Sequence, residues 1–174
     1  VDLDFGYSNI DSMLAIAGHT NIMDLYNNYD KKNKKFPLDI LNEVVIHHPS
    51  GLDILLGPPR LEQGDLFRDF HIKSLIEALK EANYDIIIFD TTTELRETTL
   101  TLLENVKNIL LIIEQNVCTI NDTQKIIETL QSLDISKKKL NLILNKTSHN
   151  SIIATNEIFQ HIGLPLKGTI PYDN

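Results

Sequence analysis

Short, continuous apolar runs recur along the chain, and several of them are rich in β-branched residues. Runs of this kind are typical of strands that are buried on both faces of a parallel sheet. Five runs are predicted to be such strands: residues 52–56, 86–89, 108–113, 140–144 and 167–170. Residues 1–4 resemble the end of a further strand, which turns at Gly6.

Apolar residues at helical spacing lie between these strands. Four apolar helical faces are predicted: Phe70, Leu75, Ile76 and Leu79; Thr99, Leu102, Leu103 and Val106; Ile120, Ile126, Ile127, Leu130 and Leu133; and Ile152, Ile153, Ile158, Phe159 and Ile162. Strands that alternate with helices of this length indicate repeated βαβ units. The predicted fold class is therefore α/β, with a mostly parallel sheet flanked by helices.

Residues that favour helix ends occur where these boundaries are expected. Gly163, in the sequence Gly-Leu-Pro, is predicted to end the last helix. Thr119 or Asn121 is predicted to cap the helix that follows residues 108–113, and Ser8 or Asn9 the first helix. The segment around residues 57–67 has no clear periodicity and is expected to run over the surface.

Composition and charge exclude several classes of protein. The chain has 174 residues with 42% hydrophobic content, which is enough for a substantial core. A net charge of −8 argues against general electrostatic binding of nucleic acid, so no direct DNA binding is expected from this segment. The lysine-rich run at 31–35 is interpreted as a solvated loop rather than a docking patch.

A single cysteine, Cys118, excludes an internal disulfide and a cysteine-rich zinc site. It is expected to be a small buried hydrophobe. No apolar run approaches the length of about 18 residues that would indicate a membrane span. A cytoplasmic protein is the simplest interpretation of these features.

Acidic residues close two of the predicted strands. Asp2 and Asp4 end the first, and Asp90 ends residues 84–90 and precedes three threonines that begin with Thr91. Ligands bind at the carboxyl ends of strands in open α/β sheets, and Mg²⁺ prefers oxygen ligands. The pattern therefore suits a Mg²⁺–nucleotide site. The alternative is that Asp4 only starts a turn and Asp90 only caps the next helix.

Asn145 follows the predicted strand at 140–144 and precedes a lysine. An amide at a strand end can offer both a donor and an acceptor to a purine edge. The alternative is a simple turn-forming residue. No G-x-x-x-x-G-K-[ST] phosphate loop occurs in the 174 residues.

Four segments together resemble the MinD/ParA (deviant Walker A) ATPases. Residues 2–9, Asp-Leu-Asp-Phe-Gly-Tyr-Ser-Asn, look like the D-x-D-x-G-x-x-N switch I stretch of that family. Residues 84–91 are similar to its Walker B strand, and Asn145 falls at its adenine-reading segment. Residues 163–173 resemble its closing element, which contains Ile-Pro-Tyr-Asp.

Residues 48–59, which begin His-Pro-Ser-Gly-Leu, narrow the resemblance to the CpaE/TadZ branch of pilus-assembly and localisation proteins. The resemblance covers the whole chain. It implies that residues 1–174 form a single ATPase domain that lacks its first strand, phosphate loop and first helix. ATP and Mg²⁺ are the implied cofactors.

The resemblance also implies a role for each matched residue. Asp4 would position the attacking water and act through Mg²⁺, and Asp2 would support it, so these are the candidate catalytic residues. Asp90 would hold Mg²⁺ through water, with Thr91 beside it. Asn9 would face the γ-phosphate or a partner subunit.

The nucleobase would be held by residues from the second half of the chain. Asn145 would read the adenine, and the backbone around Pro171 and Tyr172 would wall the base. One departure from the family pattern is Thr-Thr-Glu at 92–94, where Pro-Pro-Gly is common. Glu94 would bring negative charge towards the phosphate unless it turns away.

Two functions are consistent with these features. The first is an ATPase that forms a homodimer on binding ATP and recruits protein partners at a membrane or cell pole. It would serve pilus assembly, polar localisation, division-site placement or partition, and would be cytoplasmic or peripheral to the inner membrane. The second is a non-catalytic scaffold that keeps the fold and localises partner proteins. A flavodoxin- or receiver-like domain ranks below both, because it does not explain Asn145 together with the ending at residues 170–173.

Overall fold

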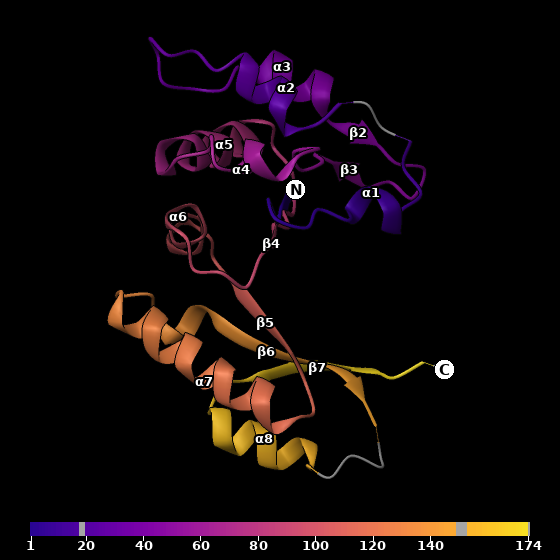
Figure 1. Ribbon diagram of the computed structural model, residues 1–174, viewed down its shortest axis with the longest axis vertical. Helices are drawn as coiled ribbons and strands as arrows, with labels where there is room; N and C mark the ends of the chain where they lie inside the picture. The colour runs from indigo at the N-terminus through magenta and orange to yellow at the C-terminus, as the bar shows by residue number, and fades with distance from the viewer. Residues whose placement is uncertain (18–19, 149–152, 174) are drawn as a thin grey trace. The chain divides into compact units, whose positions relative to one another are not determined.

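The computed structural model describes residues 1–17, 20–148 and 153–173. The chain divides into two compact units, Val1–Asn105 and Val106–Asn174. Each unit is an α/β arrangement in its own right, with parallel strands and flanking helices (Figure 1). The α/β class predicted from the sequence is therefore confirmed.

The first unit is built around a short central strand. Strand β1 (Asp2–Leu3) pairs in parallel with β4 (Asp90–Thr91), and Asp2 lies opposite Asp90 in the register. On its other edge, the N–H of Asp2 donates to the carbonyl of Leu55 at 2.9 Å. Strands β2 (Ile46–His47) and β3 (Asp53–Ile54) form an antiparallel pair just before Leu55. The predicted strands at residues 1–4 and 52–56 therefore lie side by side.

The described residues of this unit form the helices α1 (Ile10–Met13), α2 (Ile22–Asn27), α3 (Leu38–Val44), α4 (Leu61–Gly64), α5 (Asp69–Glu81) and α6 (Glu97–Asn105). Helix α5 is the longest of them, and Leu75, Ile76 and Leu79 on its predicted apolar face are buried. Phe70, assigned to the same face, is 45% exposed. The second predicted face, on α6, buries Thr99 and Leu102.

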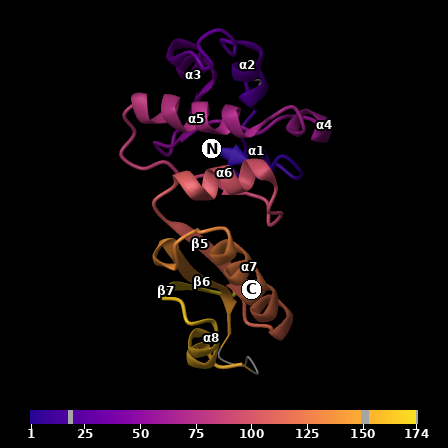
Figure 2. The same cartoon turned by 90° about the vertical axis from the view of Figure 1, so that its left-hand side faces the viewer.

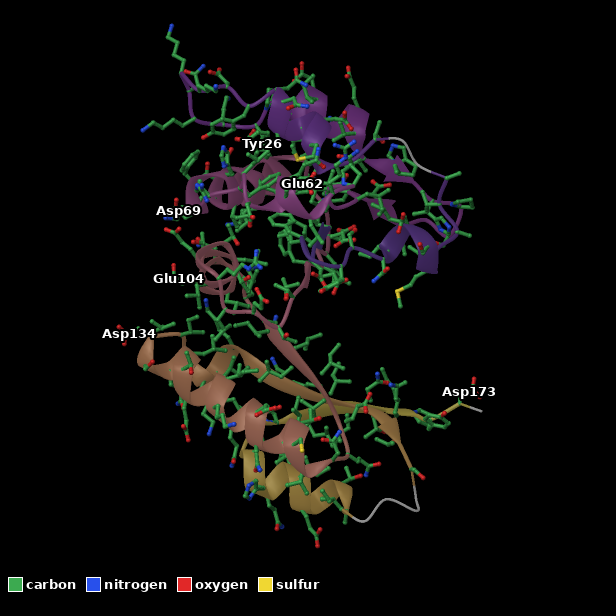
Figure 3. All side chains as sticks on the ribbon, in the orientation of Figure 1. Tyr26, Glu62, Asp69, Glu104, Asp134 and Asp173 are labelled. Atoms are coloured by element: carbon green, nitrogen blue, oxygen red, sulfur yellow. The ribbon has the colours of Figure 1, made fainter. Side chains whose placement is uncertain are left out.

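An aromatic cluster packs α2 against α5. Tyr26 projects from α2 towards α5 (Figure 3), and its ring centre lies 5.0 Å from that of His71. Tyr29, Phe36 and Phe67 also have ring contacts with His71. Burial lowers the pKa of His71, which keeps its ring neutral in this apolar setting.

The expectation that residues 86–89 form a buried strand is wrong. Strand geometry is confined to β4, although the carbonyl of Ile88 accepts a hydrogen bond from the Val1 amino group at 2.8 Å. Ile86 and Ile88 are 79% and 72% exposed. These side chains are exposed because no described part of the chain packs over them.

The second unit contains a three-stranded parallel sheet in the order β5 (Ile109–Glu114), β6 (Leu140–Thr147) and β7 (Leu166–Pro171). Helices α7 (Val117–Ser132) and α8 (Thr155–Ile162) lie on one side of it (Figures 1 and 2). A short 3-10 turn, η1 (Lys137–Lys139), precedes β6. The three predicted segments are confirmed as strands, but residues 167–170 of β7 are exposed rather than buried. Strand β6 continues to Thr147, so Asn145 lies within it.

The two faces of this sheet differ in burial. Leu140, Leu142 and Leu144 are completely buried beneath the helices. Leu110 and Ile112, on the alternate positions of β5, are 54% and 60% exposed. Side chains alternate between the faces of a strand, so one face of the sheet is covered by described residues and the other is open at β5.

Helix ends in this unit agree with the sequence in part. Gly163 ends α8 with φ +65°, as predicted. The cap of α7 was wrongly predicted: the helix begins at Val117, and Oδ1 of Asn116 accepts the N–H of Thr119 at 2.8 Å. Because the helix begins this early, Cys118 lies in its first turn and is exposed rather than buried.

Among the apolar positions predicted for α7 and α8, most behave as expected. Ile120, Ile127, Leu130, Ile158 and Ile162 are buried. Leu133 and Phe159 are 44% and 42% exposed, because they lie at the margins of their faces. Ile152, which was included in the last face, lies outside the described residues.

The segment at 57–67 is less irregular and less exposed than expected. It contains helix α4, and the backbone on both sides turns inward: Gly57, Pro58 and Phe67 are buried. In the described part of the chain, no helix is long and apolar enough to cross a membrane.

Candidate functional site

The turn that follows β1 is organised by Asp4. Its Oδ1 accepts the backbone N–H groups of Gly6 and Tyr7, each at 3.1 Å. A carboxylate that receives two successive amides fixes the direction of the loop. Within the described residues, Oδ2 of Asp4 has no hydrogen-bond partner, which leaves this oxygen available to a water or a hydrated cation.

Asp2 lies beneath that turn and is fully buried. Its Oδ1 accepts the N–H of Asp4 at 3.1 Å, and its Oδ2 accepts a short hydrogen bond from the hydroxyl of Ser8. Burial raises the pKa of Asp2 from its ordinary value, and the Ser8 hydroxyl opposes that rise. Both oxygens of Asp2 are thus committed to holding the loop in place.

Gly57 closes the other side of this arrangement. A Cβ at this position would lie 2.8 Å from Ser8 Oγ and 3.3 Å from Asp2 Cγ, so a larger residue would displace the Ser8 side chain. A cavity of about 490 Å³ opens between the Ser8 loop and the Gly57 loop. Its lining includes residues 5–9 and 56–59.

Asp90 and Thr91 lie beside β1 as a direct result of the parallel register. Asp90 faces Asp2 across the pair, and Thr91 faces Leu3. Asp90 is exposed and Thr91 is half-buried. Asp4 comes directly after β1, whereas Asp90 is the first residue of β4 and lies opposite Asp2. The two carboxylates therefore belong to adjacent parallel segments, near the edge where α/β sheets bind ligands.

Of the two residues predicted to cap the first helix, Asn9 is the N-cap of α1, but its side chain makes no capping hydrogen bond. Its side-chain amide donates instead to the carbonyl of Tyr7 at 2.7 Å. The hydroxyl of Ser8 turns inward to Asp2. Asn9 is exposed, so its position permits contact with a ligand or another chain.

Asn145, Pro171 and Tyr172 come together at one end of the second unit's sheet. Pro171 is paired with Thr147, and the N–H of Tyr172 donates to the Thr147 carbonyl at 3.0 Å. Asn145 precedes Thr147 on β6, is half-buried, and its Oδ1 accepts the N–H of Lys146 at 3.0 Å. These residues share a carboxyl strand end within this unit.

Lys146 neutralises a carboxylate next to this end. Its Nζ lies 2.7 Å from Oε1 of Glu114, which is opposite Asn145 in the register. The hydrogen bond to Glu114 raises the pKa of Lys146 and keeps it positive. The described residues contain no group of three side chains able to hold a metal by themselves.

Sequence reasoning missed two residues of the site. Ser8 was predicted as a helix cap and lies in the stretch that resembles switch I, and Gly57 lies in the segments at 48–59 and 57–67, but neither was assigned a role in the site. Both depend on tertiary contact with Asp2. The sequence offers one indication that Asp2 has such a partner. An aspartate on a buried strand needs a hydrogen-bond donor nearby to offset the cost of removing its carboxylate from water.

Two curated sequences are similar to the chain, although no family model matches it. The putative septum site-determining protein MinD of Emiliania huxleyi is 24% identical over 178 residues, covering 98% of this chain. Its counterpart in Oltmannsiellopsis viridis is 23% identical over 181 residues, covering 100% of this chain. The chain spans only 61% and 54% of the length of these relatives.

Solved structures show the same fold. A ParA family ATPase from Chlorobium tepidum matches with a TM-score of 0.86 at 20% identity, over 99% of this chain and 70% of that one. MinD in the Aquifex aeolicus MinC:MinD complex gives 0.74 at 18% identity, over 99% and 67%. MinD of Pyrococcus horikoshii, complexed with Mg-ADP, gives the same values. The chain thus has the fold of MinD/ParA ATPases over part of their length, which disfavours the flavodoxin-like alternative.

Proposed function

We propose that this chain is part of a nucleotide-switched positioning ATPase of the MinD/ParA kind. The observation that carries the proposal is the parallel register of β1 and β4, which puts Asp90 beside Asp2, on the strand next to the one that leads into the Asp4 turn. The likeness in sequence and fold to MinD and ParA proteins supports it.

In this proposal Mg²⁺–ATP is the bound group, and the metal would spread the negative charge that develops on the transferred phosphoryl group. The oxygens of Asp4 and Asp90 suit a hydrated Mg²⁺ because they are hard donors at one sheet edge. Asp4 would orient the attacking water through its free Oδ2. Asp2 would hold that turn, and Thr91 would add a hydroxyl beside Asp90.

The remaining contacts would come from the exposed Asn9 and from the second unit. Asn9 would face the γ-phosphate or a partner subunit. Asn145 would read the adenine edge with its amide, and the backbone at Pro171 and Tyr172 would wall the base. The shared strand end of these last three residues supports that assignment.

The phosphate-binding donors would come from sequence outside the 174 residues. We propose that a strand, a phosphate loop and a helix, absent from this chain, complete the domain. The exposed Ile86, Ile88, Leu110 and Ile112 support this, because buried sheet positions would be covered by such an element.

The biological role proposed is placement of protein partners by an ATP-dependent homodimer, in the cytoplasm or at the periphery of a membrane or pole. Residues 48–59 favour the CpaE/TadZ branch and pilus assembly within this family. The curated relatives carry the name septum site-determining protein, so division-site placement is the other role.

A non-catalytic scaffold is the second candidate, favoured by Thr-Thr-Glu at 92–94. Glu94 donates its N–H to Thr92 Oγ1 at 3.3 Å, so this segment is held in a turn without a glycine. The Glu94 carboxylate pairs with Arg96 at 2.6 Å, which partly offsets its charge. An N–H aimed at the γ-phosphate is harder to provide from such a turn.

The test uses a longer chain that includes the proposed upstream strand–loop–helix unit of roughly 30 residues. Calorimetry measures its binding of Mg²⁺–ATP, and light scattering measures its molecular mass. We expect binding and ATP-dependent dimerisation. Asp90→Ala should abolish the Mg²⁺-dependent part of the affinity. Asp85→Ala, which removes an exposed carboxylate from the same segment, is the matched control and should bind as the parent does. A folded extended chain that binds no nucleotide would refute the ATPase and leave the scaffold.

A further inference from the structure

The connection between α2 and α3 carries a concentrated positive charge. We call residues 31–35 the basic loop; its four lysines are Lys31, Lys32, Lys34 and Lys35, and all are exposed. Within the described chain, none of the four ammonium groups lies within salt-bridge distance of a carboxylate. Figure 1 shows this connection extending away from both helices. The charges are therefore available to a partner.

The backbone of the basic loop is fixed by Asp30. Its Oδ1 accepts the N–H groups of Lys32 and Asn33 at 2.9 and 3.0 Å, and Oδ2 accepts the side-chain amide of Asn33. Asp30 and Lys35 also exchange two backbone hydrogen bonds, at 3.0 and 3.3 Å. A loop that is already ordered loses less conformational entropy when it binds.

The base of the loop is anchored in the core. Phe36 is only 3% exposed, and its N–H donates to the buried hydroxyl of Ser74 on α5 at 2.8 Å. Its ring makes an edge contact with Tyr29 at 5.0 Å. Both aromatic side chains that flank the basic loop thus face inward, and its exposed residues are polar.

The surroundings of the basic loop are strongly acidic. Residues 1–105 contain eighteen Asp and Glu but only nine Lys and Arg, and four of those nine are in the loop. The positive field is therefore local. At physiological ionic strength it is screened beyond about 8 Å, so only a ligand close to the loop experiences it undiminished.

We propose that the basic loop is a docking site for a short acidic segment of a partner protein. The four lysines lie within five consecutive residues, so a run of a few Asp or Glu side chains is a ligand of opposite charge and comparable length. Lysine suits this ligand, since its ammonium is a compact charge that pairs with a carboxylate without requiring a fixed planar geometry.

Extended polyanions fit this surface less well. A bilayer or a nucleic acid duplex spans many screening lengths and would also meet the acidic remainder of residues 1–105. The basic loop exposes no aromatic side chain on which single-stranded bases could stack. It has no apolar residue at its tip to insert into a membrane interface.

The probe for the test is a fluorescein-labelled hexaglutamate peptide, titrated with the 174-residue chain and followed by anisotropy at about 50 mM salt. We expect saturable binding that weakens as salt rises. The loop variant K31Q/K32Q/K34Q/K35Q should bind about ten- to a hundredfold more weakly, given the contribution of each exposed ion pair. The control K137Q/K138Q/K139Q removes the lysine run of η1, in which Lys137 and Lys138 are exposed and Lys139 is half-buried, and it should bind as the parent does.

The variant Asp30→Ala distinguishes two explanations of hexaglutamate binding: recognition by an ordered loop, and attraction to positive charge alone. This variant makes the region more positive but removes three hydrogen bonds that fix the basic loop. We expect it to bind hexaglutamate more weakly; tighter binding would contradict the ordered site. Equal loss in the loop variant and the η1 control would overturn the proposal. So would tighter binding of anionic phospholipid vesicles or duplex DNA through the same four lysines.

Discussion

Replacing Ser8 by alanine tests the buried carboxylate on which the candidate site is built. The hydroxyl of Ser8 donates to Asp2, which is 0% exposed and whose pKa burial raises. A hydrogen bond to a buried charged group contributes about 1.5–3 kcal/mol. Ser8→Ala should therefore lower the free energy of unfolding by about that amount at pH 7.

The loss should depend on pH in a defined direction. The Ser8 hydroxyl favours the ionised form of Asp2, so its removal raises the folded-state pKa further. A raised carboxyl pKa means that stability falls as pH rises from the unfolded value of 3.8 through the folded pKa. The cost of Ser8→Ala should thus be largest at pH 7 and shrink towards pH 4, where Asp2 takes up a proton.

Urea unfolding followed by circular dichroism measures this, since the chain has no tryptophan. Ser12→Ala, at an exposed serine on α1, is the matched control and should change the unfolding free energy by less than about 0.5 kcal/mol. An equal loss at pH 7 and pH 4, or a loss no greater than that of the control, would refute the assigned role of Ser8.

Two further changes test the packing around the site and the aromatic core. Gly57→Ala should destabilise the chain by about 1–3 kcal/mol, because the new Cβ would lie 2.8 Å from Ser8 Oγ. Gly168→Ala, which meets nothing within 4 Å, should not show this loss in the same urea titration. Burial lowers the pKa of His71 from 6.5, so stability should fall as pH drops below about 6.5, when the unfolded chain takes up the proton more readily. His71→Gln should flatten that fall in a series of thermal unfolding curves, and an unchanged slope would exclude His71 as its source.

The fold was predictable from the sequence where burial is decided locally. Residues 140–144 are an apolar run whose covering helices lie in the same unit, so the pattern and the packing agree there. Residues 108–113 form the predicted strand, but only one of its faces is covered, since Leu110 and Ile112 are exposed. Residues 86–89 have the same pattern, but Ile86 and Ile88 are exposed. An apolar run predicts a strand that can be buried, and the covering element has to come from elsewhere in the fold.

The acidic residues of the candidate site could be predicted from the sequence, but the residues that contact them could not. Asp4 and Asp90 stand at the ends of apolar runs, and a carboxylate in that position is visible without any structure. The inward turn of Ser8 depends on a side-chain contact with Asp2, and the close approach of Gly57 on a contact between segments about fifty residues apart. Single-sequence patterns contain no signal for such contacts. The cap of α7 at Asn116 was missed for a local reason, since several polar residues there were equally good candidates.

Asp2 on β1 and Asp4 in the turn after it differ in burial and in hydrogen-bond partners. This difference separates their proposed roles. Asp2 is buried and has both oxygens engaged, by the Asp4 N–H and the Ser8 hydroxyl. Asp4 is half-buried and uses one oxygen for the turn, leaving the other for water. A catalytic group needs an oxygen that can change partners during a reaction, which Asp4 has and Asp2 does not. Asp2 is therefore a positioning residue in the proposed ATPase, and loss of Ser8 should act on the site through the placement of Asp4.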